Sequence, residues 1–183
     1  IAGSTSLVQM SSLRQRLSTL KDALAMQPGV IIQEFFGLND QPRLNIRGSG
    51  IQSNPQRRGV YLLQDGIPVN FADGSYIIGV MDPMTAHFVE VFKGANALNF
   101  GASTLGGAIN FVSPTANKKH GANMLVKAEG GSYGYRAVAA SMGYRWQTSD
   151  AHISTSYSAQ DGHRLYNHNT RWSIAANYGL QNL

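Results

Sequence analysis

Apolar and polar residues alternate along the last third of the chain. One set of alternate positions is mostly apolar: Met124, Val126 and Ala128, then Ala151, Ile153, Thr155, Tyr157 and Ala159, then Trp172, Ile174, Ala176 and Tyr178. The positions between them are polar: Asn123, Lys127 and Glu129, then His152, Ser154, Ser156 and Ser158, then Arg171, Ser173 and Asn177. A period of two predicts β-strands with one apolar and one polar face. Residues 135–144 alternate poorly.

Two-faced antiparallel strands occur in two settings. In a soluble sandwich the apolar face packs on a second sheet. In an outer-membrane barrel it faces lipid, and the polar face lines the interior. Alternation alone favours the sandwich. Aromatic residues near the predicted strand ends fit the interfacial positions of a barrel: Tyr144, Trp146, Trp172 and Tyr178.

The N-terminal part of the chain carries a helical signal. Four leucines recur at helical spacing: Leu13, Leu17, Leu20 and Leu24. Thr19 and Asp22 form a capping box, which predicts a helix beginning at about Leu20. Pro28-Gly29 predicts its end.

Short apolar runs between turn residues predict further strands at 30–32, 43–47, 60–64, 67–69 and 89–93. Asp65-Gly66 is a strong turn dipeptide and joins two of these strands. Asp82-Pro83 predicts the start of a short helix, as an N-cap followed by proline at the first helical position. The chain therefore begins with an α+β region, a small sheet with short helices, and continues into long strands.

Composition narrows the function. With 183 residues, 43% hydrophobic and 14% charged, the chain suits one folded domain or one and a part. No run of about 18 apolar residues predicts a transmembrane helix. Cysteine is absent, which excludes disulfide and thiol chemistry. The net charge of +5 comes from scattered basic residues without aromatic stacking surfaces, so nucleic acid is not an expected partner.

Catalytic chemistry finds no support in the sequence. The histidines show no metal-ligand spacing: His87, His120, His152, His163 and His168. The glycine-rich run at 101–107 lacks the Lys-Ser/Thr ending of a phosphate-binding loop. We expect no enzyme activity, no catalytic residues, no metal site and no cofactor.

Four ordered motifs span residues 19–112. They are Leu20-Lys21-Asp22-Ala23-Leu24 with Pro28-Gly29-Val30, Asn45-Ile46-Arg47-Gly48, Leu63-Gln64-Asp65-Gly66-Ile67-Pro68, and Val89-Glu90-Val91-Phe92-Lys93-Gly94 followed by Gly106-Gly107-Ala108-Ile109-Asn110. Together they resemble the plug domain of TonB-dependent outer-membrane receptors. From Gln64 to Val112 the similarity points to ferric-citrate-type siderophore receptors.

The resemblance implies a plug domain at residues 1–116. Residues 117–183 would then form the first four strands, as two hairpins, of a transmembrane β-barrel of about 22 strands. Four strands cannot close a barrel, so the chain is expected to be a fragment. The implied protein lies in the outer membrane of a Gram-negative bacterium, in contact with lipid. A TonB-type energy-coupling protein would power it, although no TonB box is evident.

The resemblance also implies site residues. Plug cations lock against barrel carboxylates in this family, which suggests a plug–barrel gate at Arg47, Glu90 and Lys93. Lys93 stands where the family usually has a second arginine. Two outward loops would bind the ligand, through Phe35, Phe36, Asn39, Asp40 and Gln41 and through Asn70, Phe71, Asp73, Ser75 and Tyr76. Aromatic and amide groups suit an organic chelate better than a bare ion, so a ferric chelate is the expected ligand.

Two alternatives stay open. A soluble plug-like binding module with a short β appendage would share residues 1–116. An outer-membrane barrel with a structural or adhesive role would share the strands without transporting a ligand.

Overall fold

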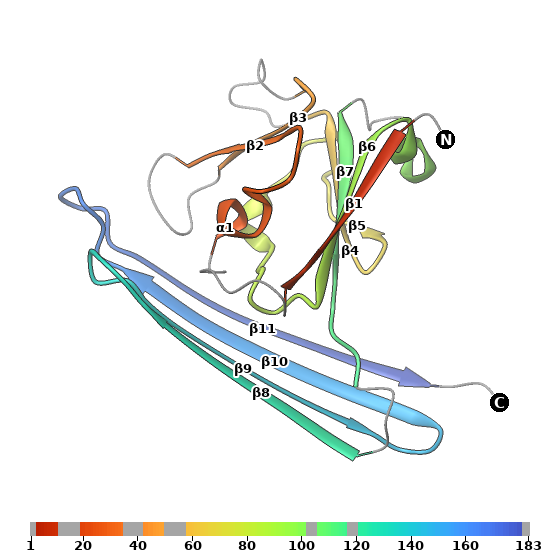
Figure 1. Cartoon of the computed structure of the whole chain (residues 1–183), viewed down its shortest axis with the longest axis vertical. Coiled ribbons are helices and arrows are strands. Elements are labelled where there is room, and N and C mark those ends of the chain that lie inside the picture. The colour runs from red at the N-terminus through yellow and green to blue at the C-terminus, as the bar shows by residue number, and fades with distance from the viewer. Residues whose placement is uncertain are drawn as a thin grey trace.

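The computed structural model describes residues 3–10, 19–34, 42–49, 58–101, 106–116 and 121–180. Its N-terminal region contains a five-stranded mixed sheet and a two-stranded ribbon, and its C-terminal region is a four-stranded sheet. The N-terminal region lies on one face of the four-stranded sheet, which we call the inner face (Figure 1). The mixed sheet stands edge-on above that face, and helix α1 (Leu20–Leu24) lies nearby.

The mixed sheet has the strand order β1-β6-β7-β4-β5. Its strands are β1 (Gly3–Gln9), β4 (Val60–Gln64), β5 (Ile67–Pro68), β6 (Phe88–Gly94) and β7 (Gly107–Val112). Strands β4 and β7 are parallel, and the other neighbours are antiparallel. Strand β1 was not expected, because its small polar sequence carries no apolar pattern. It is the edge strand of the sheet and pairs with β6 along its whole length.

Helix α1 begins as the capping box predicts. The Thr19 hydroxyl accepts a hydrogen bond from the Asp22 N–H at 3.1 Å, and the Asp22 carboxylate accepts one from the Thr19 N–H at 3.1 Å. Leu13 and Leu17 lie outside the described residues. The chain then forms the ribbon of β2 (Val30–Gln33) and β3 (Arg43–Ile46). The described part of this region also contains the 3-10 helices η2 (Ile78–Val80) and η3 (Ala95–Phe100).

The helix expected at Asp82-Pro83 is wrong. Residues 83–85 form a turn, in which Asp82 Oδ1 accepts a hydrogen bond from the Met84 N–H at 2.9 Å. Directly after this turn the His87 N–H donates to the Val112 carbonyl at 2.8 Å, so pairing with the sheet takes the place of a longer helix. The N-cap geometry that the sequence predicts is thus present, but it caps a single turn.

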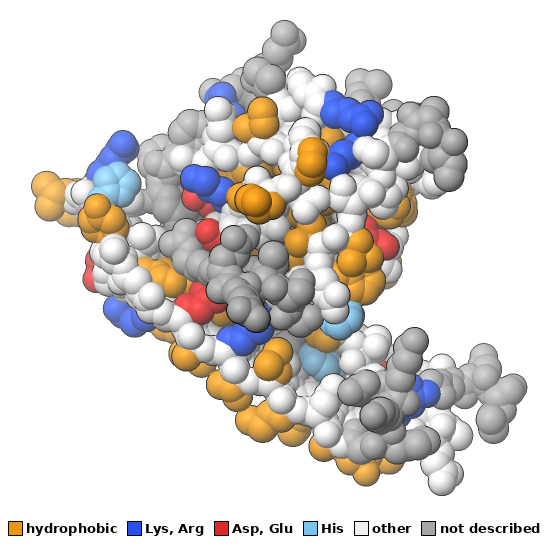
Figure 2. Space-filling model, in the orientation of Figure 1, with side chains coloured by type: hydrophobic (Ala, Val, Ile, Leu, Met, Phe, Trp, Pro, Cys, Tyr) orange, Lys and Arg blue, Asp and Glu red, His pale blue; other side chains and the backbone are white. Residues whose placement is uncertain are grey.

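The four-stranded sheet has the order β11-β10-β9-β8, and all its neighbours are antiparallel. Its strands are β8 (Gly121–Gly130), β9 (Arg136–Arg145), β10 (Ser149–Gln160) and β11 (Asn169–Leu180). The predicted alternation is confirmed: apolar residues such as Met124, Ile153 and Trp172 are exposed on the outer face. Figure 2 shows hydrophobic side chains along the side of this sheet that faces away from the N-terminal region. Strand β9 also alternates, burying Ala137 and Ala139.

The main hydrophobic core belongs mostly to the N-terminal region. Its fully buried residues include Leu24, Ile46, Leu62, Val89, Ile109 and Phe111. Tyr135, Ala137 and Ala139 of the four-stranded sheet join the same cluster. No described helix is both long and apolar enough to cross a membrane. The predicted domain boundary at 116/117 stays a prediction, since residues 117–120 lie outside the described part.

Candidate functional site

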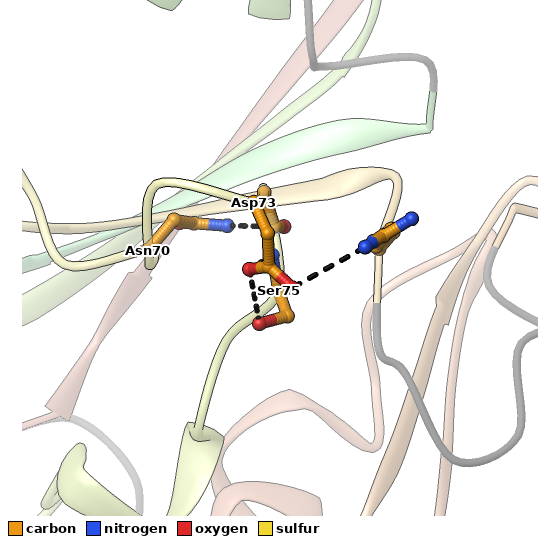
Figure 3. Close-up of polar contacts among 5 residues, drawn as sticks. Asn70, Asp73 and Ser75 are labelled. Atoms are coloured by element: carbon orange, nitrogen blue, oxygen red, sulfur yellow. Dashed lines mark hydrogen bonds and ion pairs between the residues drawn. The ribbon is translucent and has the colours of Figure 1, made fainter.

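The loop at residues 70–76 is fastened to the start of β4 by Asn70. The Asn70 side chain accepts a hydrogen bond from the Leu62 N–H at 2.7 Å and donates to the Val60 and Gly74 carbonyls at 3.1 and 3.2 Å. Figure 3 shows Asn70, Asp73 and Ser75 within this loop. Because both ends of the amide are engaged, Asn70 holds the loop in shape.

Asp73 is the charged centre of this loop. Its Oδ1 accepts hydrogen bonds from the Ser75 N–H at 3.0 Å and the Ser75 hydroxyl at 2.6 Å. Arg58 donates to Oδ2 at 3.2 Å, and the two side chains are about half exposed. These contacts, led by the Ser75 hydroxyl, lower the pKa of Asp73 from 3.8 to about 2. Asp73 therefore stays ionised across the physiological range.

The two aromatic residues of the loop have different environments. Phe71 is 54% exposed, so its ring is open to a ligand. Tyr76 is 3% exposed, belongs to the main core, and donates its hydroxyl hydrogen to the Leu44 carbonyl at 3.5 Å. The structure thus gives Tyr76 a packing role. The other predicted ligand residues lie outside the described residues: Phe35, Phe36, Asn39, Asp40 and Gln41.

Arg47 follows β3 in a left-handed conformation, with φ of 51°. Its N–H donates to the Gly29 carbonyl at 2.9 Å, and its guanidinium donates to the Ser4 hydroxyl at 3.1 Å. The guanidinium passes over Gly94, where a Cβ would meet Arg47 Nη1 at 2.9 Å. Gly94 therefore keeps open the place that the Arg47 side chain occupies.

Lys93 is the second cation at this end of the mixed sheet. It is 4% exposed, and its Nζ donates to the Ser6 hydroxyl at 2.8 Å. Burial lowers the pKa of Lys93, and the positive charge of Arg47 adds to this effect. Within the described part of the chain, neither cation forms an ion pair. The structure thus places the charges of Arg47 and Lys93 close enough to act on each other.

Glu90 lies on the opposite face of β6 from Lys93, because the two are three positions apart in the strand. It accepts a hydrogen bond from the Asn110 amide at 2.8 Å. Asn110 Oδ1 in turn accepts the Gly66 N–H at 2.9 Å. Glu90 is therefore tied to the Asp65-Gly66 turn and not to the two cations.

The sequence analysis missed several polar residues. The serines of β1 that bind the two cations, Ser4 and Ser6, carried no signal without knowledge of strand pairing. The contact of Asp82 with Ser156 and Ser173 was also missed, because Asp82 was interpreted only as a cap. The alternation could have indicated the two serines, since it places Ser156 and Ser173 on the polar face, but it gives no sign of their partner Asp82.

Comparison with known proteins identifies the N-terminal region. The family model described as TonB-dependent Receptor Plug Domain matches residues 1–108. The vitamin B12 transporter BtuB of Vibrio vulnificus (strain YJ016) is 27% identical over 128 residues, which cover 68% of this chain and 20% of that protein. The chain therefore spans about a fifth of the length of this curated relative.

Solved structures share the fold of both regions. The copper transporter OprC superposes with a TM-score of 0.74 at 17% identity, covering 97% of this chain and 28% of that one. The ferric-catecholate import receptor Fiu from E. coli gives 0.71 at 21% identity, covering 97% and 24%. These relatives are transporters and receptors, not enzymes. The matched plug model confirms the resemblance seen in the motifs: this chain belongs to the TonB-dependent receptors of the Gram-negative outer membrane.

Proposed function

We propose that this chain is the plug and the first part of the barrel of a transporter that imports a ferric chelate. We call strands β8 to β11, which form this part of the barrel, the wall. In this proposal residues 1–116 form the plug, and residues 117–183 begin a barrel whose outer face contacts lipid. A TonB-type protein supplies the energy that moves the plug. The observation that carries the proposal is the pair of neighbouring plug cations, Arg47 and buried Lys93, with no carboxylate partner among the described residues.

Two adjacent positive charges repel each other, and burial raises the cost. Hydroxyls of Ser4 and Ser6 offset only part of this cost. A carboxylate from later barrel strands would complete the arrangement and hold the plug closed. The proposed gate therefore consists of Arg47 and Lys93, and Glu90 lies apart from it on the other face of β6.

The gate can be tested by passive leakage. In the full-length receptor, Arg47→Ala should raise the influx of a large antibiotic, because it strands the barrel carboxylate without its partner. Arg47 is exposed in this structure, so a cost of about 3–5 kcal/mol applies if later barrel strands bury the pair. Arg58→Ala is the matched control: it removes an exposed plug arginine that pairs with Asp73. Unchanged leakage in Arg47→Ala together with lost ligand binding would move Arg47 from the gate to the ligand site.

The ligand class is proposed from the exposed loop. Phe71 offers a ring for stacking, and Asp73 and Ser75 offer polar groups around it. Such groups suit the organic shell of a chelate. The names of two similar proteins, the ferric-catecholate receptor Fiu and the pyoverdine receptor FpvA, support an iron chelate. OprC and BtuB make copper and cobalamin the alternatives to test.

Calorimetric titration of the full-length receptor with ferric chelates, cobalamin and free copper tests the ligand class. We expect tight binding of a ferric chelate only, weakened by Phe71→Ala. Leu98→Ala is the control, since Leu98 is a similarly exposed apolar plug residue outside the loop. Asn39→Ala tests the first predicted loop. Tight binding of free copper with no response to any chelate would refute the ferric-chelate assignment.

A further inference from the structure

Asp82 lies where the N-terminal region meets the inner face of the four-stranded sheet. Its Oδ1 holds the turn at residues 82–85 through the Met84 N–H. Its Oδ2 accepts hydrogen bonds from the hydroxyls of Ser156 and Ser173. These two serines are register partners on β10 and β11. One carboxylate oxygen therefore joins a turn of the N-terminal region to two neighbouring strands.

The contact is shielded from water. Ser156 is 4% exposed, and Asp82 and Ser173 are partly buried. A carboxylate in such a place is costly unless hydrogen bonds replace its water. Among the described residues Asp82 forms no ion pair, although its charge acts at longer range on Arg171 of the same inner face. Neutral donors, the two serine hydroxyls and the Met84 N–H, thus hold the carboxylate.

Small side chains on the inner face allow the turn to approach. Strand β10 presents a row of buried serines: Ser154, Ser156 and Ser158. On the other side of the turn, Met84 is 8% exposed and lines a small cavity with Leu125 and Ala139. The turn therefore directs Asp82 toward β10 and β11, and Met84 toward β8 and β9.

We propose that Asp82 is a latch between plug and wall: its carboxylate, held by Ser156 and Ser173, fastens the turn at 82–85 to β10 and β11. The latch must release before the plug can leave this part of the wall. This inference rests on the proposed function, in which plug movement opens the barrel. In the proposed gate the plug supplies the cations Arg47 and Lys93. In the latch the plug instead supplies an anion, the Asp82 carboxylate.

The chemistry of the latch makes its release abrupt. Hydrogen bonds between a carboxylate and hydroxyls weaken steeply with distance and angle, whereas the attraction within an ion pair falls off gradually. Both hydroxyls bind the same oxygen, so one displacement of the turn breaks both contacts. The latch therefore holds the closed plug firmly and offers little resistance once the turn has moved.

Influx of a large glycopeptide antibiotic into cells with the full-length receptor tests the latch without any ligand. Two variants weaken it independently: Asp82→Asn, which replaces the charged acceptor by a neutral amide, and Ser156→Ala combined with Ser173→Ala, which removes both donors and leaves the plug sequence intact. Each should raise influx about tenfold, the effect of about 1.4 kcal/mol on an equilibrium. Combining all three changes should add little, because they remove the same contact. Ser154→Ala is the matched control, as its buried hydroxyl has no hydrogen-bond partner in the described structure.

A receptor lacking residues 1–116 separates the two proposals. If it admits the antibiotic while Asp82→Asn and the serine pair stay tight, the latch is refuted and the proposed function stands. If it also excludes the antibiotic, there is no plugged pore and the proposed function fails, and the latch with it. Additive effects of the plug and wall variants, or equal leakage in Ser154→Ala, would likewise overturn the latch.

Discussion

Side chains alternate between the two faces in both the mixed sheet and the four-stranded sheet. The mixed sheet buries its apolar positions, whereas the four-stranded sheet exposes them. Strand β6 buries Val89 and Val91 on its core face. Strand β10 instead buries the polar residues His152, Ser154, Ser156 and Ser158 and exposes Ile153 and Tyr157 on its outer face. Because exposed apolar surface is unfavourable in water, the two sheets require different surroundings. Alternation therefore defines strands, while the chemistry of the buried face distinguishes a plug sheet from a wall sheet.

Separating the two regions should give the largest effect. We expect residues 115–183 alone to stay unprotected or aggregate in buffer, since their outer apolar face has no lipid and their polar face no plug. Residues 1–114 alone should be at least partly ordered. Amide hydrogen exchange on each purified segment measures this. A monomeric, protected 115–183 segment in water would contradict the wall assignment.

A cavity in the mixed sheet should affect the plug and spare the wall. Phe111 is 1% exposed in the main core, and Phe111→Ala should destabilise the plug by about 3–5 kcal/mol. Hydrogen exchange in the full-length receptor should show faster exchange in β4, β6 and β7, with β8 to β11 unchanged. Phe100→Ala is the control, because Phe100 is only partly buried beside Phe92.

A charge on the outer face of the four-stranded sheet should destabilise strands β8 to β11 and leave the plug unchanged. Ile174 lies mid-strand and is 60% exposed, so Ile174→Arg should destabilise the inserted wall by about 2–4 kcal/mol if lipid covers this face. Thr170→Arg on the same face near the strand end should cost about 0–1 kcal/mol. Unfolding titrations of the receptor in lipid vesicles compare them. Equal, negligible costs would indicate that water covers the outer face.

The smallest effect concerns acid. The pKa of Asp73 is lowered to about 2, so its contribution to stability is complete above 3.8 and is lost as the pH falls through about 2. The contacts of Asp73 with Ser75 and Arg58 should be intact at pH 4 and weaken as the pH falls toward 2, while Asn70 still holds the loop. Ser75→Ala should raise the pKa of Asp73 more than Arg58→Ala does, since the Ser75 hydroxyl is the larger cause. Carboxyl NMR titration of labelled receptor measures both.

Local signals in the sequence predicted the elements whose cause is local. The Thr19 and Asp22 cap, the Asp65-Gly66 turn and the alternation of β8, β10 and β11 depend on neighbouring residues, and all are present. Strand β1 was not predicted, because its stability comes from pairing with the distant strand β6. The prediction of a helix at Asp82 was wrong for a related reason. Pairing of β6 with distant strands fixes the chain from Phe88 onward, so the cap at Asp82 starts only a single turn.

For the candidate site, too, the sequence indicated which residues to consider, but not the features that depend on tertiary packing. The family pattern singled out Arg47, Glu90 and Lys93 together, yet it could not show that Glu90 lies on the other face of β6 from Lys93. The family resemblance indicated an outward loop with polar and aromatic residues at 70–76. It could not separate exposed Phe71 from buried Tyr76, since burial in a loop depends on tertiary packing.

The latch also has a consequence for the order of folding. Hairpins β8–β9 and β10–β11 close over short loops, whereas the Asp82–Ser173 contact joins residues 91 positions apart. Closing long loops costs more entropy, so local hairpins are expected to form first. Ser173 is also synthesised well after Asp82, and the Asn177–Pro114 bond spans 63 positions. The contact between the turn at residues 82–85 and strands β10 and β11 is therefore expected to form late in the folding of this chain.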